Sequence, residues 1–440
     1  MSRAVTHAGA LPSGSRYVAE APENWNGVLL LFSKPVPVAP GEPPWQHGDP
    51  LIDQLVGSGY AVAGSANTIF WPLELAFSDQ PALLDTVERL IGPARHTIGI
   101  GLSIGGIITA GLVQRFPERL SGALPMCGNL AGAVGNHNRE LDIAFVIRTL
   151  LEPDSSLQLV HITDPDQNLR RARAVLTEAQ ASAAGRARLA LAAAMGNIPG
   201  WNDPLLPQAA AEDFVARQRN QFAWFDQVGF LIMFWAREQV EQQAGGNPSW
   251  NTGVDYGDLL DTSINRDEVE ALYTAAALNL QDDLARLASE TRIDADLEAV
   301  AYLEQHIVFS GELNGIPVLT VHTDGDGLVT PDNERAYAEV VELAGHQEFL
   351  RQLYIHRGGH CSFTAAEILT ALGALLGRIE SGSWPSLEPA ALNASADALG
   401  VGVGANLLPP GQSTAAAFFD YRPERFPRQY DARSKGGWSG

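Results

Sequence analysis

Cysteine and basic residues are scarce in this sequence, and both shortages exclude classes of function. Only two cysteines occur among 440 residues, so a metal site made of several thiolates is excluded. Lysine and arginine together number 29 against 51 aspartates and glutamates, which gives a formal net charge of −22. Because no basic cluster is present to neutralise phosphates, we expect neither a nucleic-acid partner nor an anionic membrane.

Long uncharged apolar runs are also absent, as are the sequences Gly-Lys-Ser and Gly-Lys-Thr that a P-loop requires. Residues 1–10 hold no apolar segment of signal-peptide length. These absences predict a cytoplasmic protein without membrane contact, while the oligomeric state stays open. Hydrophobic residues make up 45% of the chain, enough for a large buried core.

The most informative stretch is His96 to Gly106, where an apolar run typical of a strand meets a run typical of a helix. Residues 101–105 read Gly-Leu-Ser-Ile-Gly, a Gly-x-Ser-x-Gly motif. A strand that turns sharply into a helix leaves no room for Cβ atoms two residues before and after the turn, which explains both glycines. Ser103 then exposes its hydroxyl at the helix N-terminus, beside the N–H of Ile104. The alternative is a glycine-rich turn with a solvated serine.

In this context the chain resembles the α/β-hydrolase superfamily. The resemblance implies a nucleophile, an acid and a histidine in that order along the chain. It also implies a second oxyanion-binding N–H in the loop after the apolar run at 28–32. That loop reads Ser-Lys-Pro-Val where the superfamily often has His-Gly, and since Pro35 has no N–H, we expect Val36 or a neighbour to donate. Lys34 would add positive charge there, unless it is a solvated lysine at a loop tip.

A triad acid is expected after the strand pattern at 317–321, where it would accept a hydrogen bond from the histidine. The following loop contains Asp324 and Asp326. Asp326 matches the superfamily pattern Gly-Asp-x-x-Val-x-Pro, so we take it as the acid and Asp324 as the alternative. The non-catalytic alternative is that the aspartate forms an Asx-type turn that caps the next helix.

Two histidines follow the last strand pattern of the core, at 348–355. His360 comes after two glycines, in a loop flexible enough to bring its imidazole over Ser103, and is the expected general base. His356 lies closer to the strand and is expected to be structural. The alternative for His360 is an ordinary surface histidine.

The two cysteines lie beside these motifs. Cys361 adjoins the expected base, and Cys127 follows the strand pattern after the serine motif. Some esterases of the tannase type brace the catalytic histidine with an adjacent disulfide, and the resemblance raises that pairing here. In the absence of a leader sequence, however, we expect two buried, reduced thiols.

The pattern of elements changes twice along the chain. Strand and helix patterns alternate as far as Gly122 to Met126, which predicts a mostly parallel sheet flanked by helices. Helical patterns then dominate until a strand pattern returns at Pro317 to Val321. We therefore predict a first part of an α/β-hydrolase core at 1–137, an inserted helical cap at 138–310, a second part of the core at 311–382 and a C-terminal extension packed on the core at 383–440.

Aromatic residues gather in two stretches that we expect near the functional site. Residues 67–77 include Phe70 and Trp71 and carry few charges, which predicts a substrate-binding loop, although core packing explains the rings equally well. Residues 221–235, in the predicted cap, include Trp224 and Phe225. They can line an apolar ligand pocket, but a cap also needs its own core.

Together these features predict a serine hydrolase that acts on a carboxylic ester or lactone of a mainly apolar small molecule. Ser103 attacks, His360 moves the proton, Asp326 orients the imidazole, and no metal or organic cofactor is required. Acyl transfer, or elimination of an acyl group in natural-product biosynthesis, is an alternative on the same fold that the altered 33–36 loop suggests. The third hypothesis is a binding protein without turnover.

Overall fold

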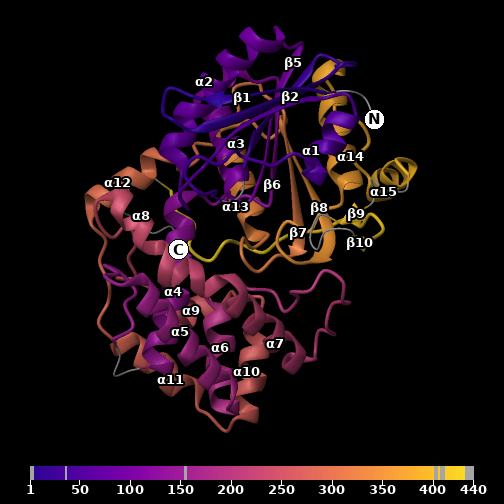
Figure 1. Ribbon diagram of the computed structural model, residues 1–440. Coiled ribbons are helices and arrows are strands. Elements are labelled where there is room, and N and C mark those ends of the chain that lie inside the picture. The colour runs from indigo at the N-terminus through magenta and orange to yellow at the C-terminus, as the bar shows by residue number, and fades with distance from the viewer. Residues whose placement is uncertain (1–3, 35–36, 153–155, 401–404, 407–411, 432–440) are drawn as a thin grey trace.

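The computed structural model describes residues 4–34, 37–152, 156–400, 405–406 and 412–431. Its centre is a nine-stranded sheet with the order β1-β2-β4-β3-β5-β6-β7-β8-β11 (Figure 1). The six central strands, β4-β3-β5-β6-β7-β8, are parallel to their neighbours. At the edges, β2 pairs antiparallel with β4 and with β1, and β11 pairs antiparallel with β8. The strands are β1 (Ala4–Ala10), β2 (Arg16–Pro22), β3 (Val28–Ser33), β4 (Ala61–Ser65), β5 (His96–Leu102), β6 (Gly122–Met126), β7 (Val318–Gly325), β8 (Leu350–Gly358) and β11 (Phe418–Phe419).

Helices cover both faces of the sheet, which explains why inner strands such as β3 are buried along their whole length. Helices α1 (Pro50–Gly57), α14 (Ala365–Ser381) and α15 (Pro389–Ala398) share one core cluster with the sheet. Helices α2 (Leu73–Ile91), α3 (Ile104–Arg115) and α13 (Asp332–Leu343) share the cluster on the other face. The predicted fold class is confirmed: this is an α/β-hydrolase fold.

A group of helices lies between β6 and β7 in the sequence. Most of them share a core cluster of their own, whereas Val240, Val300 and Leu303 belong to the cluster of α2 and α3. Figure 1 shows most of the group packed below the sheet, at the end where the arrows of β7 and β8 point. We call these helices the cap: α4 (Gly132–Leu151), α5 (Pro165–Gln180), α6 (Ala183–Ala194), α7 (Phe214–Trp224), α8 (Arg237–Ala244), α9 (Tyr256–Asp261), α10 (Arg266–Ala275), α11 (Leu280–Ser289) and α12 (Leu297–Gln305). Two π-helical segments, Phe225–Gly229 and Ile232–Ala236, join α7 to α8.

The stretch at 67–77 differs from the predicted loop. Helix α2 begins at Leu73, so only the first part of the stretch, with Phe70 and Trp71, is irregular. Pro81 stands inside this helix rather than near its start. Buried apolar residues continue at helical spacing on both sides of the proline, and their burial outweighs the loss of one backbone hydrogen bond.

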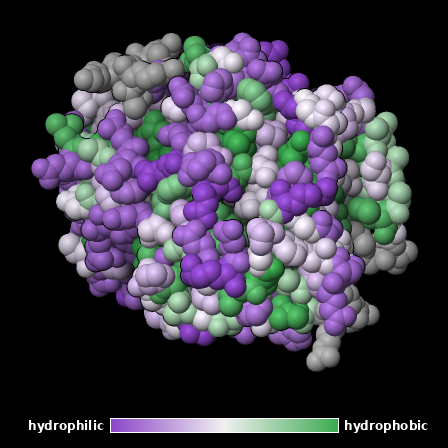
Figure 2. All heavy atoms as spheres, turned by 90° about the horizontal axis from the view of Figure 1, so that it is seen from above, coloured by the Kyte–Doolittle hydropathy of each residue, from purple (hydrophilic) through white to green (hydrophobic). Residues whose placement is uncertain are grey.

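The chain after α15 returns to the core. Phe418 pairs with Ile355 of β8 at the sheet edge, and Phe426 is buried against Ala131 and Ala336. In the space-filling view, hydrophilic residues cover much of the visible face and hydrophobic ones form small separate groups (Figure 2). Among the described helices, none combines the length and the apolar character that crossing a bilayer requires.

Candidate active site

Ser103 stands at the sharp turn between β5 and α3. Its φ of 57° and ψ of −124° lie outside the regions that residues with a side chain prefer. A Cβ atom on Gly101 would overlap the carbonyl oxygen of Gly105, and one on Gly105 would overlap the carbonyl oxygen of Ser33. Only glycine fits at either place, and the strained turn leaves Ser103 partly exposed.

The backbone around Ser103 is held from the neighbouring strand. The Ser103 N–H donates to the carbonyl oxygen of Met126, at the end of β6, over 2.9 Å. Ile104 is the first residue of α3, and the N–H groups of a first turn have no acceptor within their own helix. This N–H is therefore a candidate donor to an oxyanion beside Ser103. Val36, the other expected donor, lies outside the described residues.

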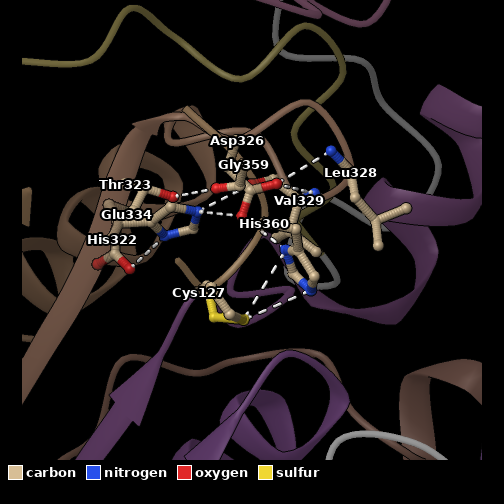
Figure 3. The surroundings of a disulfide bond; sticks show 10 residues. Cys127, His322, Thr323, Asp326, Leu328, Val329, Glu334, Gly359 and His360 are labelled. Atoms are coloured by element: carbon tan, nitrogen blue, oxygen red, sulfur yellow. Dashed lines mark hydrogen bonds and ion pairs between the residues drawn. A yellow bond between two sulfur atoms is a disulfide. The ribbon is translucent and has the colours of Figure 1, made fainter. Parts of the chain in front are cut away.

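Asp326 and His360 form a close pair at the carboxyl ends of β7 and β8. Nδ1 of His360 lies 2.6 Å from Oδ2 of Asp326 (Figure 3). The other carboxylate oxygen of Asp326 accepts from the N–H groups of Leu328 and Val329, each over 3.0 Å. Asp326 is wholly buried, which by itself would raise its pKa, but the charges and hydrogen bonds of His360 and His322 outweigh burial and lower it.

The alternative acid has another partner. Asp324 lies 2.8 Å from Nδ1 of His356, and its second oxygen accepts from the N–H of Arg357. The structure therefore separates two acid–histidine pairs, and only Asp326 reaches His360. The backbone of the histidine loop is fixed by Thr323, whose hydroxyl donates to the carbonyl oxygen of Gly359 over 2.8 Å.

The expectation of two reduced thiols is wrong, because Cys127 and Cys361 form a disulfide (Figure 3). Cys127 follows β6 and Cys361 follows β8, and both strands end at the same edge of the sheet, so the two Cα atoms lie 5.6 Å apart. The resemblance to tannase-type esterases indicated this pairing, although 234 positions separate the cysteines in the sequence. Sγ of Cys361 is 3.5 Å from Nε2 of His360.

The disulfide has two consequences for other expectations. Ligand atoms of Cys127, His360 and Cys361 lie within 4.8 Å of one another, but sulfurs bonded to each other are not the thiolates that bind metals. Structural disulfides are typical of oxidising compartments and rare in the cytoplasm. The bond therefore does not favour the cytoplasmic location that the sequence suggests.

The expected substrate-binding residues lie in three places. Lys34 follows β3 and lines a hollow with Trp45 and Asp49; burial lowers the pKa of its ammonium, and the charge of Asp49 partly offsets this. Phe70 packs edge-to-face on Trp235, which lies in the second π-helical segment.

Trp71 is buried beside the His137 ring of α4, with ring centroids 4.6 Å apart. Trp224 and Phe225 are also buried, and both line a pocket with Gly327, the residue after the acid Asp326. The indole N–H of Trp224 donates to the carbonyl oxygen of Trp201. Core packing accounts for these rings, because Trp224 and Phe225 are only 4% and 0% exposed.

Sequence reasoning assigned no role to His322 and Glu334, which adjoin Asp326. Both side chains are wholly buried, and Nδ1 of His322 lies 2.9 Å from Oε1 of Glu334. Nε2 of His322 is 3.6 Å from the Asp326 oxygen that also contacts His360. The available signal was a histidine directly after the apolar strand pattern at 317–321, four positions before Asp326.

No protein-family model matches the chain. An o-phthalyl amidase of Xanthobacter agilis is 28% identical in an alignment that covers 91% of this chain and 93% of that protein. Feruloyl esterase B of Aspergillus oryzae is 14% identical with a TM-score of 0.46, covering 87% of this chain and 82% of its own. A further esterase of Aspergillus oryzae is 16% identical with a TM-score of 0.44, covering 87% of this chain and 80% of its own.

Proposed function

We propose that the protein hydrolyses an amide or ester of a carboxylic acid, with Ser103 as nucleophile, His360 as general base and Asp326 as the acid that orients it. The observation that carries this proposal is the 2.6 Å contact between Asp326 and His360, in loops that follow parallel strands at the edge where Ser103 stands on its strained turn. Catalytic groups of an open α/β sheet gather at this carboxyl edge.

Each residue has a defined role in the reaction. Nε2 of His360 takes the proton from Oγ of Ser103 as the oxygen attacks the substrate carbonyl, and the N–H of Ile104 binds the oxyanion. His360 then gives the proton to the leaving nitrogen or oxygen, which leaves an ester on Ser103. A water, deprotonated by the same histidine, releases the acid. Asp326 holds the Nδ1–H in place and stabilises the imidazolium in both halves.

For the substrate we propose an aromatic acyl group. The Xanthobacter agilis relative is named for o-phthalyl amides, and the alignment extends over nearly the whole of both chains. We therefore place amides of a benzoic acid with an ortho carboxylate first, and aromatic esters and lactones second.

Hydrolysis of matched substrates tests this function. A 2-carboxybenzoyl anilide and the corresponding phenyl ester differ only in the leaving atom, and the benzoyl anilide lacks only the ortho carboxylate. We expect release of aniline from the first compound by the wild-type protein and not by the Ser103→Ala variant. Ser78→Ala, on the exposed side of α2, serves as the matched control. Incorporation of one labelled oxygen from ¹⁸O-water into the acid separates hydrolysis from transfer and elimination.

A further inference from the structure

The inference concerns His322 and Glu334, and it rests on the proposed function because it assigns them a task toward Asp326. Nε2 of His322 lies 2.8 Å from the carbonyl oxygen of Val329. A backbone carbonyl can only accept a hydrogen bond, so Nε2 carries a proton. The state of the other ring nitrogen depends on Glu334.

Glu334 accepts hydrogen bonds with its side chain and with its backbone carbonyl. Its Oε2 accepts from the hydroxyl of Thr320 and, over 2.7 Å, from the amide of Gln352. The Gln352 amide nitrogen also donates to the Glu334 backbone carbonyl, which fixes its orientation. One proton lies between Oε1 of Glu334 and Nδ1 of His322. Oε2 already accepts from two donors, which favours the ion pair over a neutral acid beside a neutral imidazole. In the ion pair the ring is an imidazolium.

The electrostatic balance agrees with this protonation state. Burial acts to lower the pKa of His322, but the hydrogen bonds and charges of Asp326 and Glu334 outweigh it and raise the pKa to about 10. Two further charged groups face this cluster, Asp332 at the start of α13 and Arg139 on α4, and both are buried.

Two tyrosines beside Glu334 do not titrate near neutrality. Burial, followed by the charge of Glu334, raises the pKa of both Tyr337 on α13 and Tyr354 on β8. Of the described groups that contact Asp326, His360 is consequently the one expected to change its charge during catalysis.

We infer that the His322–Glu334 ion pair is a positioning element for the catalytic acid, which supplies a fixed buried positive charge on the side of Asp326 opposite to His360. Figure 3 shows Asp326 between the two imidazoles, with Glu334 behind His322. The charge keeps Asp326 ionised in a dry site, and it repels a second positive charge on the neighbouring His360 ring. Glu334 compensates the charge of His322 from the far side.

Neutral variants of the pair test this task through the pH dependence of Ser103 reactivity. The probe is a fluorophosphonate, whose rate of reaction with Ser103 depends on free His360 and does not depend on knowing the substrate. His322→Gln leaves the Glu334 carboxylate buried without its cation, so we expect the acidic limb of the rate profile to move upward by about one pH unit. Glu334→Gln keeps the His322 ring and should not move its limb upward. The double variant loses the His322 charge together with the more distant Glu334 charge, so its limb should move upward by less than that of His322→Gln.

If the pair had only a structural role, the melting temperature would fall in all three variants. The acidic limbs of their rate profiles would then not shift in an order set by the charges. The inference is overturned if the three limbs coincide with that of the wild type or all move upward together. If His322→Gln does not fold, a double variant whose limb coincides with that of the wild type overturns the inference equally.

A spectroscopic measurement on the wild type is independent of activity. ¹⁵N histidine spectra should show one imidazole with both nitrogens protonated up to about pH 9, and this signal should be missing from the double variant. A neutral His322 at pH 7 would overturn the inference. Absence of any fluorophosphonate adduct on the folded wild type would instead overturn the proposed function, and the spectra would still decide the state of His322.

Discussion

At the scale of single residues, the site depends on two positions where only glycine fits. Ser103 keeps a strained backbone because Gly101 and Gly105 allow the β5–α3 turn to close against itself and against Ser33. Local strain of this kind persists only where the surrounding structure imposes it.

A methyl group at Gly105 should therefore disrupt the turn. Gly105→Ala places its Cβ against the Ser33 carbonyl oxygen, and we expect a loss of about 1–3 kcal/mol in the free energy of unfolding together with loss of Ser103 reactivity. Gly373→Ala is the matched control: it lies within α14, its Cβ meets nothing within 4 Å, and it should stabilise the protein by about 0.5–1 kcal/mol. Urea unfolding measures both. Equal effects would contradict the steric account.

The two aspartates of the acid loop should differ in catalysis. Asp326→Asn removes the acceptor that fixes the tautomer of His360, and kcat should fall by about 10⁴-fold. Asp324→Asn affects the separate His356 pair and should change kcat far less. Steady-state kinetics on the anilide compare the two, and a larger fall for Asp324→Asn would reverse the assignment.

At the scale of elements, the site is assembled by the ends of strands that are adjacent in the sheet and distant in the sequence. The disulfide joins the ends of β6 and β8 across β7, next to the histidine loop. It therefore links the first part of the core to the second, across the whole cap.

Removing this link should cost stability and loosen the histidine. Because the bond closes a long loop, we expect Cys127→Ala/Cys361→Ala to lose about 2–5 kcal/mol in the free energy of unfolding. We also expect a lower kcat, since Sγ of Cys361 contacts His360. Urea unfolding and kinetics with and without reductant measure both effects. A double variant as stable as the wild type, or a wild type unaffected by reduction, would contradict this role.

Local patterns predicted most of the elements that carry the site. The turn at Ser103, the apolar strand before Asp326 and the glycines before His360 are signals within a few residues, and all three can be read in the sequence. Contacts between distant segments left no such signal: neither the pairing of the cysteines nor the burial of His322 against Glu334 follows from local spacing. The start of α2 was missed because aromatic residues without charges suggest a loop as readily as a buried helix.

At the scale of the whole molecule, the C-terminal extension ties the cap to the core. Arg428 forms a 2.7 Å ion pair with Asp142 of α4, and both side chains are buried. The extension also pairs with β8 through Phe418. The cap is thus fastened by a segment that follows both parts of the α/β core in the sequence.

Breaking this ion pair should destabilise the fold strongly. Arg428→Met leaves the Asp142 carboxylate buried without its cation, and we expect a loss of about 3–5 kcal/mol in the free energy of unfolding. Arg428→Met/Asp142→Leu removes both charges and should regain much of the loss. Denaturant unfolding of the three proteins provides the comparison. A double variant less stable than Arg428→Met would show that the contact matters for reasons other than charge.

The central claim is that Ser103 is an activated nucleophile, and intact-mass analysis after incubation with a fluorophosphonate tests it most directly. We predict one adduct on the wild type and on Ser78→Ala, and none on Ser103→Ala or His360→Ala. An adduct that persists on Ser103→Ala, or a folded wild type that takes up no reagent, would contradict the account.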